Sequence, residues 1–180
     1  PTPTATPAIA VLHSVPVGQQ PKGIAVMPDI NRFLVANNGD DTVSSLDGFL
    51  DWRHRQFPSG GDHPSNVAVD PERCLMYVVN TASSTVAVLS ACGNVGRSVG
   101  SVSLGEGKLP EGIAVLTTTN TIYVANAATN SVAVINGNTL VVTKNIPVGA
   151  LPAQIAVNPH TNRVYVTCRG YPLDNSGAVA

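Results

Sequence analysis

Short runs of β-branched residues, separated by turn residues, recur along the chain. Four segments begin with proline, continue as Ile-Ala-Val or Val-Ala-Val, and reach a second apolar run after a turn; they start at Pro21, Pro64, Pro110 and Pro152. Such short runs predict strands, because an amphipathic helix would need apolar residues at i, i+3 and i+4. A spacing of roughly 40–50 residues is typical of repeats that each form one β-structured unit.

Each repeat predicts four strands, named A to D in chain order. Strand A is expected at 24–26, 67–69, 113–115 and 155–157, strand B at 33–36, 76–79, 122–125 and 164–167, and strand C at 42–46, 85–89 and 131–135. Strand D is clearest at 140–148. Proline stands in the A–B turn of three repeats, where it ends the ladder because it lacks an N–H. Asparagine closes strand B in three repeats, a position where we expect it to serve the following turn.

The pattern Pro-x-x-Ile-Ala-Val-x-Pro-x-x-Asn-x-x-Tyr-Val-x-Asn resembles the YVTN-type β-propeller repeat family over roughly residues 8–180, with the best local matches at 122–126 and 164–168. The resemblance implies an all-β fold, a β-propeller of four-stranded antiparallel blades with strand A nearest the common axis. Members of this family are often bacterial or archaeal surface and exported proteins. Related propellers include lyases, lactone hydrolases and quinone- or haem-dependent oxidoreductases, although the chain has no CxxCH haem attachment motif.

The domain organisation follows from the repeat. Residues 1–7 are rich in Pro and Thr and predict an extended linker. Residues 8–180 predict about four blades, with approximate limits of 21–63, 64–109, 110–151 and 152–180 and with 8–17 as an extra outer strand. Two arrangements remain open: segment 8–17 completes the last blade and closes a four-blade ring, or the chain is a fragment of a larger propeller. The end of the chain inside a strand favours the fragment.

Composition narrows the choice of partners. The formal net charge is −1, and the ten Lys and Arg residues are scattered, so we do not expect nucleic-acid binding. No apolar run approaches the roughly 20 residues of a membrane span. A Pro/Thr tract is typical of extracellular stalks, so we expect a secreted or cell-surface protein of a bacterium or archaeon.

The candidate ligand site is the mouth of the central channel, where the loops that enter strand A converge in a propeller. Polar residues of these loops are Gln20, Lys22, Asp62, His63, Lys108, Glu111 and Gln154. Convergent polar groups at a cavity favour ligand binding. Asp62-His63 is the only pairing suited to acid–base chemistry, and it also fits an ordinary turn, so we assign no catalytic residue. His13, His54 and His160 occupy different parts of the repeat, so we expect no metal site, and we expect no cofactor.

Two segments depart from the repeat. Residues 46–57 contain the only Trp and a charge cluster where an apolar strand D is expected. We interpret them as a solvated outer strand, with an interaction edge as the alternative. Residues 169–174 form a longer loop in the last repeat, which either covers a sheet end or presents Tyr171 for recognition.

Three cysteines are present, and two of them are expected to be neighbours. If Asn80 and Thr85 flank the B–C turn of the second repeat, antiparallel pairing puts Cys74 opposite the residue before Cys92. Cross-strand neighbours lie within disulfide reach, so an exported protein would join Cys74 to Cys92, whereas a reduced one would bury two thiols. Cys168 is left as a single thiol.

These observations favour a non-catalytic binding or structural module of an exported or cell-surface protein, with a protein partner, a ligand or self-association. The alternative is a propeller enzyme, a lyase, hydrolase or oxidoreductase, with its site at the channel mouth. A third possibility is a subunit of a surface layer, a filament or a larger complex that docks through strand edges.

Overall fold

A computed structural model describes residues 14–48, 53–170 and 178–179. Within these ranges the chain is almost entirely β and forms three four-stranded sheets and one three-stranded sheet, each antiparallel and ordered as in the sequence. Blade 1 contains β1 (Pro21–Met27), β2 (Arg32–Asn37), β3 (Thr42–Asp47) and β4 (Arg53–Pro58). Blade 2 contains β5 (Pro64–Asp70), β6 (Leu75–Asn80), β7 (Thr85–Ser90) and β8 (Ser98–Ser103).

Blade 3 contains β9 (Pro110–Leu116), β10 (Thr121–Asn126), β11 (Ser131–Asn136) and β12 (Val141–Pro147), and blade 4 contains β13 (Pro152–Asn158), β14 (Arg163–Cys168) and β15 (Ala178–Val179). The described part also holds two short 3-10 helices, η1 (Pro28–Ile30) and η2 (Ala127–Thr129). The expected all-β architecture of antiparallel blades is confirmed. No helix in the described ranges has the length and apolarity to cross a bilayer.

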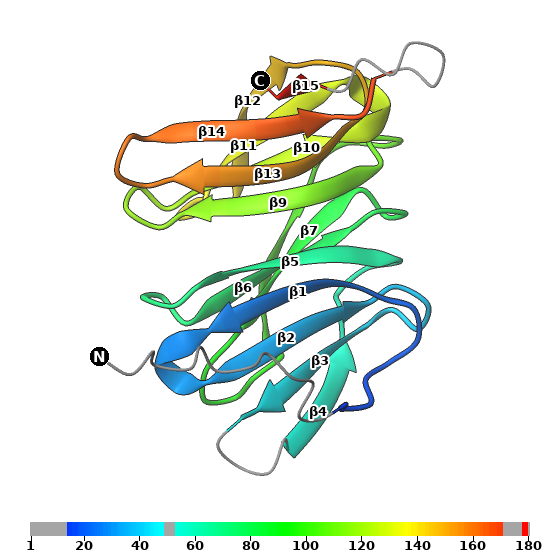
Figure 1. The fold of residues 1–180 in the computed structure, drawn as a ribbon, viewed down its shortest axis with the longest axis vertical. Helices are drawn as coiled ribbons and strands as arrows, with labels where there is room; N and C mark the ends of the chain where they lie inside the picture. Colours follow the sequence, from blue (N-terminus) through cyan, green and yellow to red (C-terminus); the bar gives the residue numbers. More distant parts are fainter. Residues whose placement is uncertain (1–13, 49–52, 171–177, 180) are drawn as a thin grey trace, which may run out of the picture.

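The first strands of the blades line the common axis. Neighbouring first strands contact one another, β1 with β5, β5 with β9, and β9 with β13. Figure 1 shows these four strands one above another through the middle of the molecule. The Ile-Ala-Val triplets therefore lie nearest the axis, as the repeat pattern predicts.

The hydrophobic core lies between the blades rather than within them. In β6, Met76 and Val78 belong to the core shared with blade 1, whereas Tyr77 and Val79 belong to the core shared with blade 3. Successive side chains of a strand point to opposite faces of the sheet, and both faces of this strand are covered. Such double burial explains why β6 reads as a continuous apolar run instead of an alternating one.

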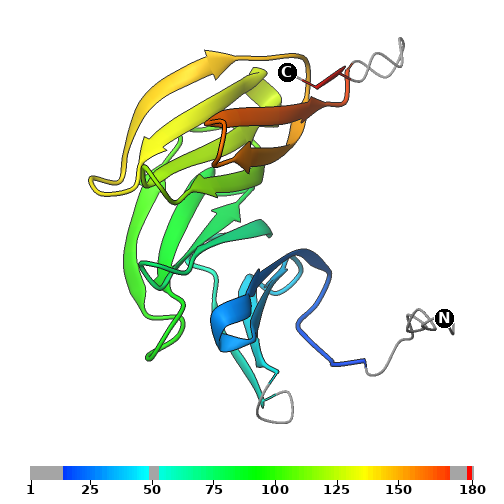
Figure 2. The same ribbon diagram turned by 60° about the vertical axis from the view of Figure 1, so that its left-hand side comes forward.

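The sheets do not close into a ring. Figure 2 shows them along an open arc, so the closed four-blade arrangement is not the one that the structure has. Of the expected extra outer strand, residues 8–13 lie outside the described residues, and residues 14–17 form no strand. The linker expected at 1–7 also lies outside them.

Exposure along strand A follows the position of the blade in the array. Ile24 of β1 is 62% exposed, whereas the equivalent Val67 of β5 and Ile113 of β9 are 4% and 6% exposed. The reason is that, within the described ranges, no blade packs on the outer side of β1.

The A–B turns share one backbone feature. The residue that precedes strand B has a left-handed conformation in every blade, at Asn31 (φ 43°), Cys74 (φ 53°), Asn120 (φ 49°) and Asn162 (φ 52°). Asparagine tolerates this conformation better than other residues with a side chain. Cys74 is the exception, and it forms a disulfide.

The disulfide joins Cys74 and Cys92, whose Cα atoms are 5.3 Å apart. The register is the expected one, because Asn80 pairs with Thr85 and Leu75 pairs with Ser90. The bond ties the A–B turn of blade 2 to residues 91–97, the loop between β7 and β8. Cys168 is free and buried.

The asparagines at the end of strand B are fully buried, at Asn37, Asn80 and Asn126. The amide of Asn37 donates to Oγ1 of Thr42 at 2.9 Å and to Oγ of Ser44 at 3.0 Å, both on the following strand. Asn80 repeats the first contact with Thr85 at 3.4 Å. These contacts give Asn37 and Asn80 a structural role in the B–C turn, whereas both amide atoms of Asn126 are buried without a hydrogen-bond partner in the described part.

Candidate functional site

The loops that enter strand A and the B–C loops lie at the same end of the molecule. Backbone hydrogen bonds join them in every blade, from Asn38 to Gln20, Thr81 to His63, Ala127 to Leu109 and Arg169 to Leu151, with N···O distances between 3.0 and 3.2 Å. Because the bonds repeat four times, this end carries a regular platform around the axis.

Strand A begins with a β-bulge in every blade. The register shifts between Pro21 and Gly23, between Pro64 and Asn66, and between Pro152 and Gln154. In blade 3 the shift is seen on the neighbouring strand β10, between Val124 and Asn126, and Asn126 is the residue that pairs with Pro110. Bulges redirect side chains, and they are common beside functional sites. Here the bulge determines the orientation of the residue two positions after each leading proline. These residues are Gly23, Asn66, Gly112 and Gln154.

Glycine alternates at this position with a residue that carries a side-chain amide, Asn or Gln. The alternation fits the short distance between the first strands of neighbouring blades. A Cβ atom on Gly23 would lie 2.6 Å from Cα of Asn66, and one on Gly112 would lie 2.5 Å from the carbonyl oxygen of Ala153. The glycines therefore allow the first strands of neighbouring blades to approach closely. Across Gly112, Nδ2 of Asn66 donates to Oε1 of Gln154 at 3.1 Å, which links blade 2 to blade 4.

This amide bridge belongs to a polar cavity of about 380 Å³ that we call the axial pocket. It is lined by Lys22, Gly23, Ser65, Asn66, Thr81, Glu111, Gln154 and Arg169. Each of the four blades contributes to the lining, so the pocket forms only when the blades are assembled.

Most polar groups of the axial pocket are already engaged. Oγ1 of Thr81 donates to the carbonyl oxygen of Pro110 at 2.7 Å, and Oγ of Ser65 donates to that of Glu111 at 3.2 Å. The carboxylate of Glu111 pairs with the guanidinium of Arg169. Lys22 is exposed and makes no hydrogen bond or ion pair within the described part of the chain, so its ammonium group is available to a ligand.

Three of the residues expected at the channel mouth meet in the axial pocket, namely Lys22, Glu111 and Gln154. Asp62, His63 and Lys108 do not line it; they lie in the loops of the same end, where their backbone N–H groups donate to Ser83 Oγ, Asp41 Oδ1 and Ser84 Oγ. His63 also takes a repeated structural position, because the residue before each leading proline has positive φ, as do Gln20, Leu109 and Leu151.

Sequence reasoning missed Ser65, Asn66, Thr81 and Arg169. A signal for two of them is present in the repeat, since Thr81 and Arg169 directly follow the residue that closes strand B. In blade 1 the same position is Asn38, whose amide donates to the carbonyl oxygen of Pro64 at 3.2 Å, as Thr81 does to Pro110. The residue at this position therefore donates to the leading proline of the next blade in two of the four repeats, and in blade 4 Arg169 pairs with Glu111 of blade 3.

Tyr171 and Trp52 lie outside the described residues, so the recognition loop and part of the expected interaction edge are not placed. The remainder of segment 46–57 includes β4, the outer strand of blade 1. In the described ranges, no group of three or more His, Cys, Asp or Glu side chains is arranged to hold a metal ion.

The blades, their axial first strands and the platform of loops at one end define the class of the fold, a β-propeller-like repeat array. Solved structures agree with this class. The chain is similar to hydrazine synthase of Kuenenia stuttgartiensis, with a TM-score of 0.77 and 19% identity over 92% of this chain and 46% of that one. It is also similar to a streptogramin B lyase, with a TM-score of 0.69 and 17% identity over 86% of this chain and 49% of that one.

A third similar structure is virginiamycin B lyase from Staphylococcus aureus, with a TM-score of 0.67 and 11% identity over 89% of this chain and 55% of that one. The chain thus spans about half the length of these proteins. At such identities the likeness shows the fold and does not carry over a function. No protein-family model matches the chain, and no curated protein matches it.

Proposed function

We propose that the chain is a binding module of a propeller on an exported or cell-surface protein, and that its axial pocket receives a carboxylate side chain of a protein partner. The observation that carries the proposal is that the axial pocket contains one positive charge that no described residue neutralises. Glu111 and Arg169 neutralise each other, whereas Lys22 has no partner among the described residues. The carboxylate of an acidic partner residue would pair with the ammonium group of Lys22. The backbone amides of the partner peptide would form hydrogen bonds with the side-chain amides of Asn66 and Gln154.

Binding explains the pocket better than catalysis does. General acid–base chemistry needs a proton-transferring group within hydrogen-bond reach of the substrate. The groups that line the pocket hold one another: the two amides are bonded to each other, and the hydroxyls of Ser65 and Thr81 donate to backbone carbonyl oxygens. The imidazole of His63 is outside the pocket lining and makes no hydrogen bond in the described part.

The disulfide supports the exported location. Disulfides persist in oxidising compartments and are rare in the cytosol. The Cys74–Cys92 bond, the Pro/Thr-rich start of the sequence and the resemblance to YVTN-type surface propellers support the same location.

An NMR titration tests the proposal. The ¹⁵N-labelled chain would be titrated with acetyl-Gly-Glu-Gly-amide and, in parallel, with the neutral acetyl-Gly-Gln-Gly-amide. We expect saturable shifts at residues 22, 66, 81 and 154 with the acidic peptide and at least about fivefold weaker binding of the neutral one, because a hydrogen bond to a charged group contributes about 1.5–3 kcal/mol.

Lys22→Gln should remove this preference. Lys144→Gln, on the exposed strand β12, is the matched control and should retain it. Equal binding of the two peptides, or a Lys22→Gln variant that behaves as the wild type, would contradict the proposal. New proton signals from a chemically altered peptide would instead support the enzyme alternative.

A further inference from the structure

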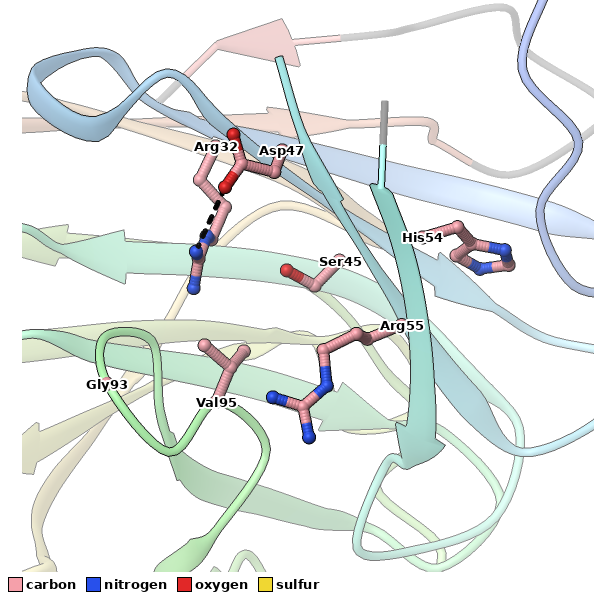
Figure 3. A pocket seen from close by; sticks show the side chains of 7 residues that line it. All are labelled: Arg32, Ser45, Asp47, His54, Arg55, Gly93 and Val95. Atoms are coloured by element: carbon pink, nitrogen blue, oxygen red, sulfur yellow. Dashed lines mark ion pairs between the residues drawn. The ribbon is translucent and has the colours of Figure 1, made fainter. Parts of the chain in front are cut away.

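A second cavity lies away from the axial pocket, between the outer strand of blade 1 and the loop 91–97 of blade 2. Its volume is about 360 Å³, and Figure 3 shows the residues that line it: Arg32, Ser45, Asp47, His54, Arg55, Gly93 and Val95. We call it the outer pocket. It combines two guanidinium groups with one carboxylate, so its local charge is positive.

Strand register aims four of these side chains into the outer pocket. Arg32 pairs with Asp47 and Ser45 pairs with Arg55, and directly paired residues project from the same face of a sheet. That face of blade 1 is the one that packs on blade 2. His54 projects from the opposite face, where Nε2 lies 2.9 Å from Oγ of Ser44, and Figure 3 shows its ring pointing away from the other side chains.

Some hydrogen-bond donors of the outer pocket have no acceptor among the described residues. Ser45 is 4% exposed, and its hydroxyl makes no hydrogen bond within the described residues. Arg32 donates through Nη1 to the carbonyl oxygen of Ala91 at 3.2 Å, while its Nε is buried without a partner. Leaving a buried donor unsatisfied costs about 1–3 kcal/mol, and more for a charged group, so an acceptor at this point would relieve that cost.

Arg55 supplies the second guanidinium and is uncommitted. It is exposed, makes no ion pair in the described ranges, and points into the outer pocket in Figure 3. Asp47 is held by Arg32, with 3.7 Å between Nη2 and Oδ2, which leaves the charge of Arg55 without an acidic neighbour in this set. A planar guanidinium fork matches the geometry of oxyanions.

The opposite wall comes from the loop that the disulfide holds. Gly93 follows Cys92 directly, and an added Cβ on Gly93 would meet nothing within 4 Å, so this side of the outer pocket is open. The loop is also held by Phe57 of β4, whose ring lies against Gly96. Val95 is 7% exposed and gives the pocket one apolar side.

We propose that the outer pocket binds a tetrahedral oxyanion, a sulfate or phosphate group that is free or esterified. Its oxygens would accept from the guanidinium groups of Arg55 and Arg32 and from the hydroxyl of Ser45. The site is independent of the axial pocket, because the two share no residue.

Calorimetric titration of the oxidised chain tests this site. The probes are sodium sulfate, sodium phosphate, phenyl sulfate and O-phosphoserine, each at constant ionic strength with chloride as the background anion. We expect saturable binding of at least one probe with a stoichiometry of one. The inorganic and esterified probes distinguish a site for the free ion from one for a modified ligand.

The variants locate the binding. Arg55→Gln should weaken binding at least about tenfold and Ser45→Ala several-fold, because both remove donors to a charged acceptor. Arg97→Gln is the matched control: Arg97 is an exposed arginine of the same loop that does not line the outer pocket, and its loss should change affinity less than twofold. Absence of saturable binding, or equal losses in Arg97→Gln and Arg55→Gln, would overturn the proposal. Circular dichroism of each variant confirms that the fold is retained.

Discussion

The phenol of Tyr77 lies in the core between blades 2 and 3, and the residue is 0% exposed. Its hydroxyl is 3.5 Å from Oδ1 of Asn120. Burial, with a smaller contribution from the charge of Asp70, raises the pKa of Tyr77 from 10.0 to about 12. The residue therefore stays neutral in the folded chain at a pH where the unfolded chain has already lost the proton.

This pKa predicts a loss of stability in alkali. Below pH 10 both states are protonated; between about pH 10 and pH 12 the unfolded state binds fewer protons, so the free energy of unfolding falls with rising pH by about 2–3 kcal/mol in total. Tyr77→Phe should remove this part of the pH dependence, measured by urea unfolding at pH 9 to 12. Tyr165→Phe, at an exposed position, should keep it; loss of the slope in both variants would contradict the assignment.

Single residues also show where sequence reasoning reached its limit. The asparagines that close strand B and the Cys74–Cys92 neighbourhood depend on register within one blade, which the repeat fixes. The Asn66–Gln154 bridge joins residues two blades apart, and nothing in either local sequence indicates the other partner. Similarly, Ser45 looks like an ordinary strand residue until the fold brings it to the same pocket as the loop of blade 2.

At the scale of the element, the spacing of first strands depends on glycine. A Cβ at Gly112 would meet backbone atoms of β13, which cannot move aside as a flexible side chain can. Gly112→Ala should therefore lower the free energy of unfolding by about 1–3 kcal/mol, the usual cost of overpacking. At Gly39 the nearest atoms are side-chain atoms of Gln19 and Gln20, so Gly39→Ala is the control. Urea denaturation would compare the free energies of unfolding of the two variants. Equal losses would show that the close approach of β9 and β13 does not require glycine at position 112.

The disulfide stabilises one element, blade 2 with its long C–D loop. It closes a span of 18 residues, for which the loss of chain entropy in the unfolded state gives roughly 3 kcal/mol. The Cys74→Ser/Cys92→Ser double variant should be destabilised by about 2–4 kcal/mol relative to the oxidised chain. Reduction of the parent chain should give a similar loss, because Cys168 takes no part in the bond. A stability that is insensitive to both changes would argue against the bond in solution.

Elements were the most predictable level of this molecule. Strands A to C follow from the β-branched runs, and their register follows from the short turns. Strand β4 was less visible because its sequence, Arg-His-Arg-Gln-Phe-Pro, is mostly polar. As an outer strand it buries little, so the apolar pattern that identifies the other strands is missing. One side chain of this polar strand, Arg55, forms one side of the outer pocket.

At the scale of the whole molecule, the open arc makes equivalent positions unequal. Ile24 and Ile113 hold the same place in the repeat, but Ile24 is 62% exposed and Ile113 is 6% exposed. Ile113→Val should cost about 0.5–1.5 kcal/mol, as expected for a methyl group removed from a core. Ile24→Val should cost less than about 0.5 kcal/mol. Chemical denaturation of both variants checks the difference, and a similar loss at Ile24 would mean that β1 is covered in solution.

The repeat places Lys22, Glu111 and Gln154 at the channel mouth, but neither the open arc nor the full lining of the two pockets could be obtained from it. A repeat fixes what each blade looks like and which strand lies inside. It does not fix whether the ends meet, since that depends on how many blades share the circle. The axial pocket is likewise a product of assembly, because it draws its residues from all four blades.

The alternation of Gly23, Asn66, Gly112 and Gln154 means that the residue type at this position repeats every two blades rather than every blade. Removing or duplicating one blade would bring two bulky amides, or two glycines, into adjacent first strands, and the result would be a steric clash or a gap at the axis. Adding or deleting a pair of blades preserves the match. The smallest interchangeable building block of this chain is therefore a pair of neighbouring blades.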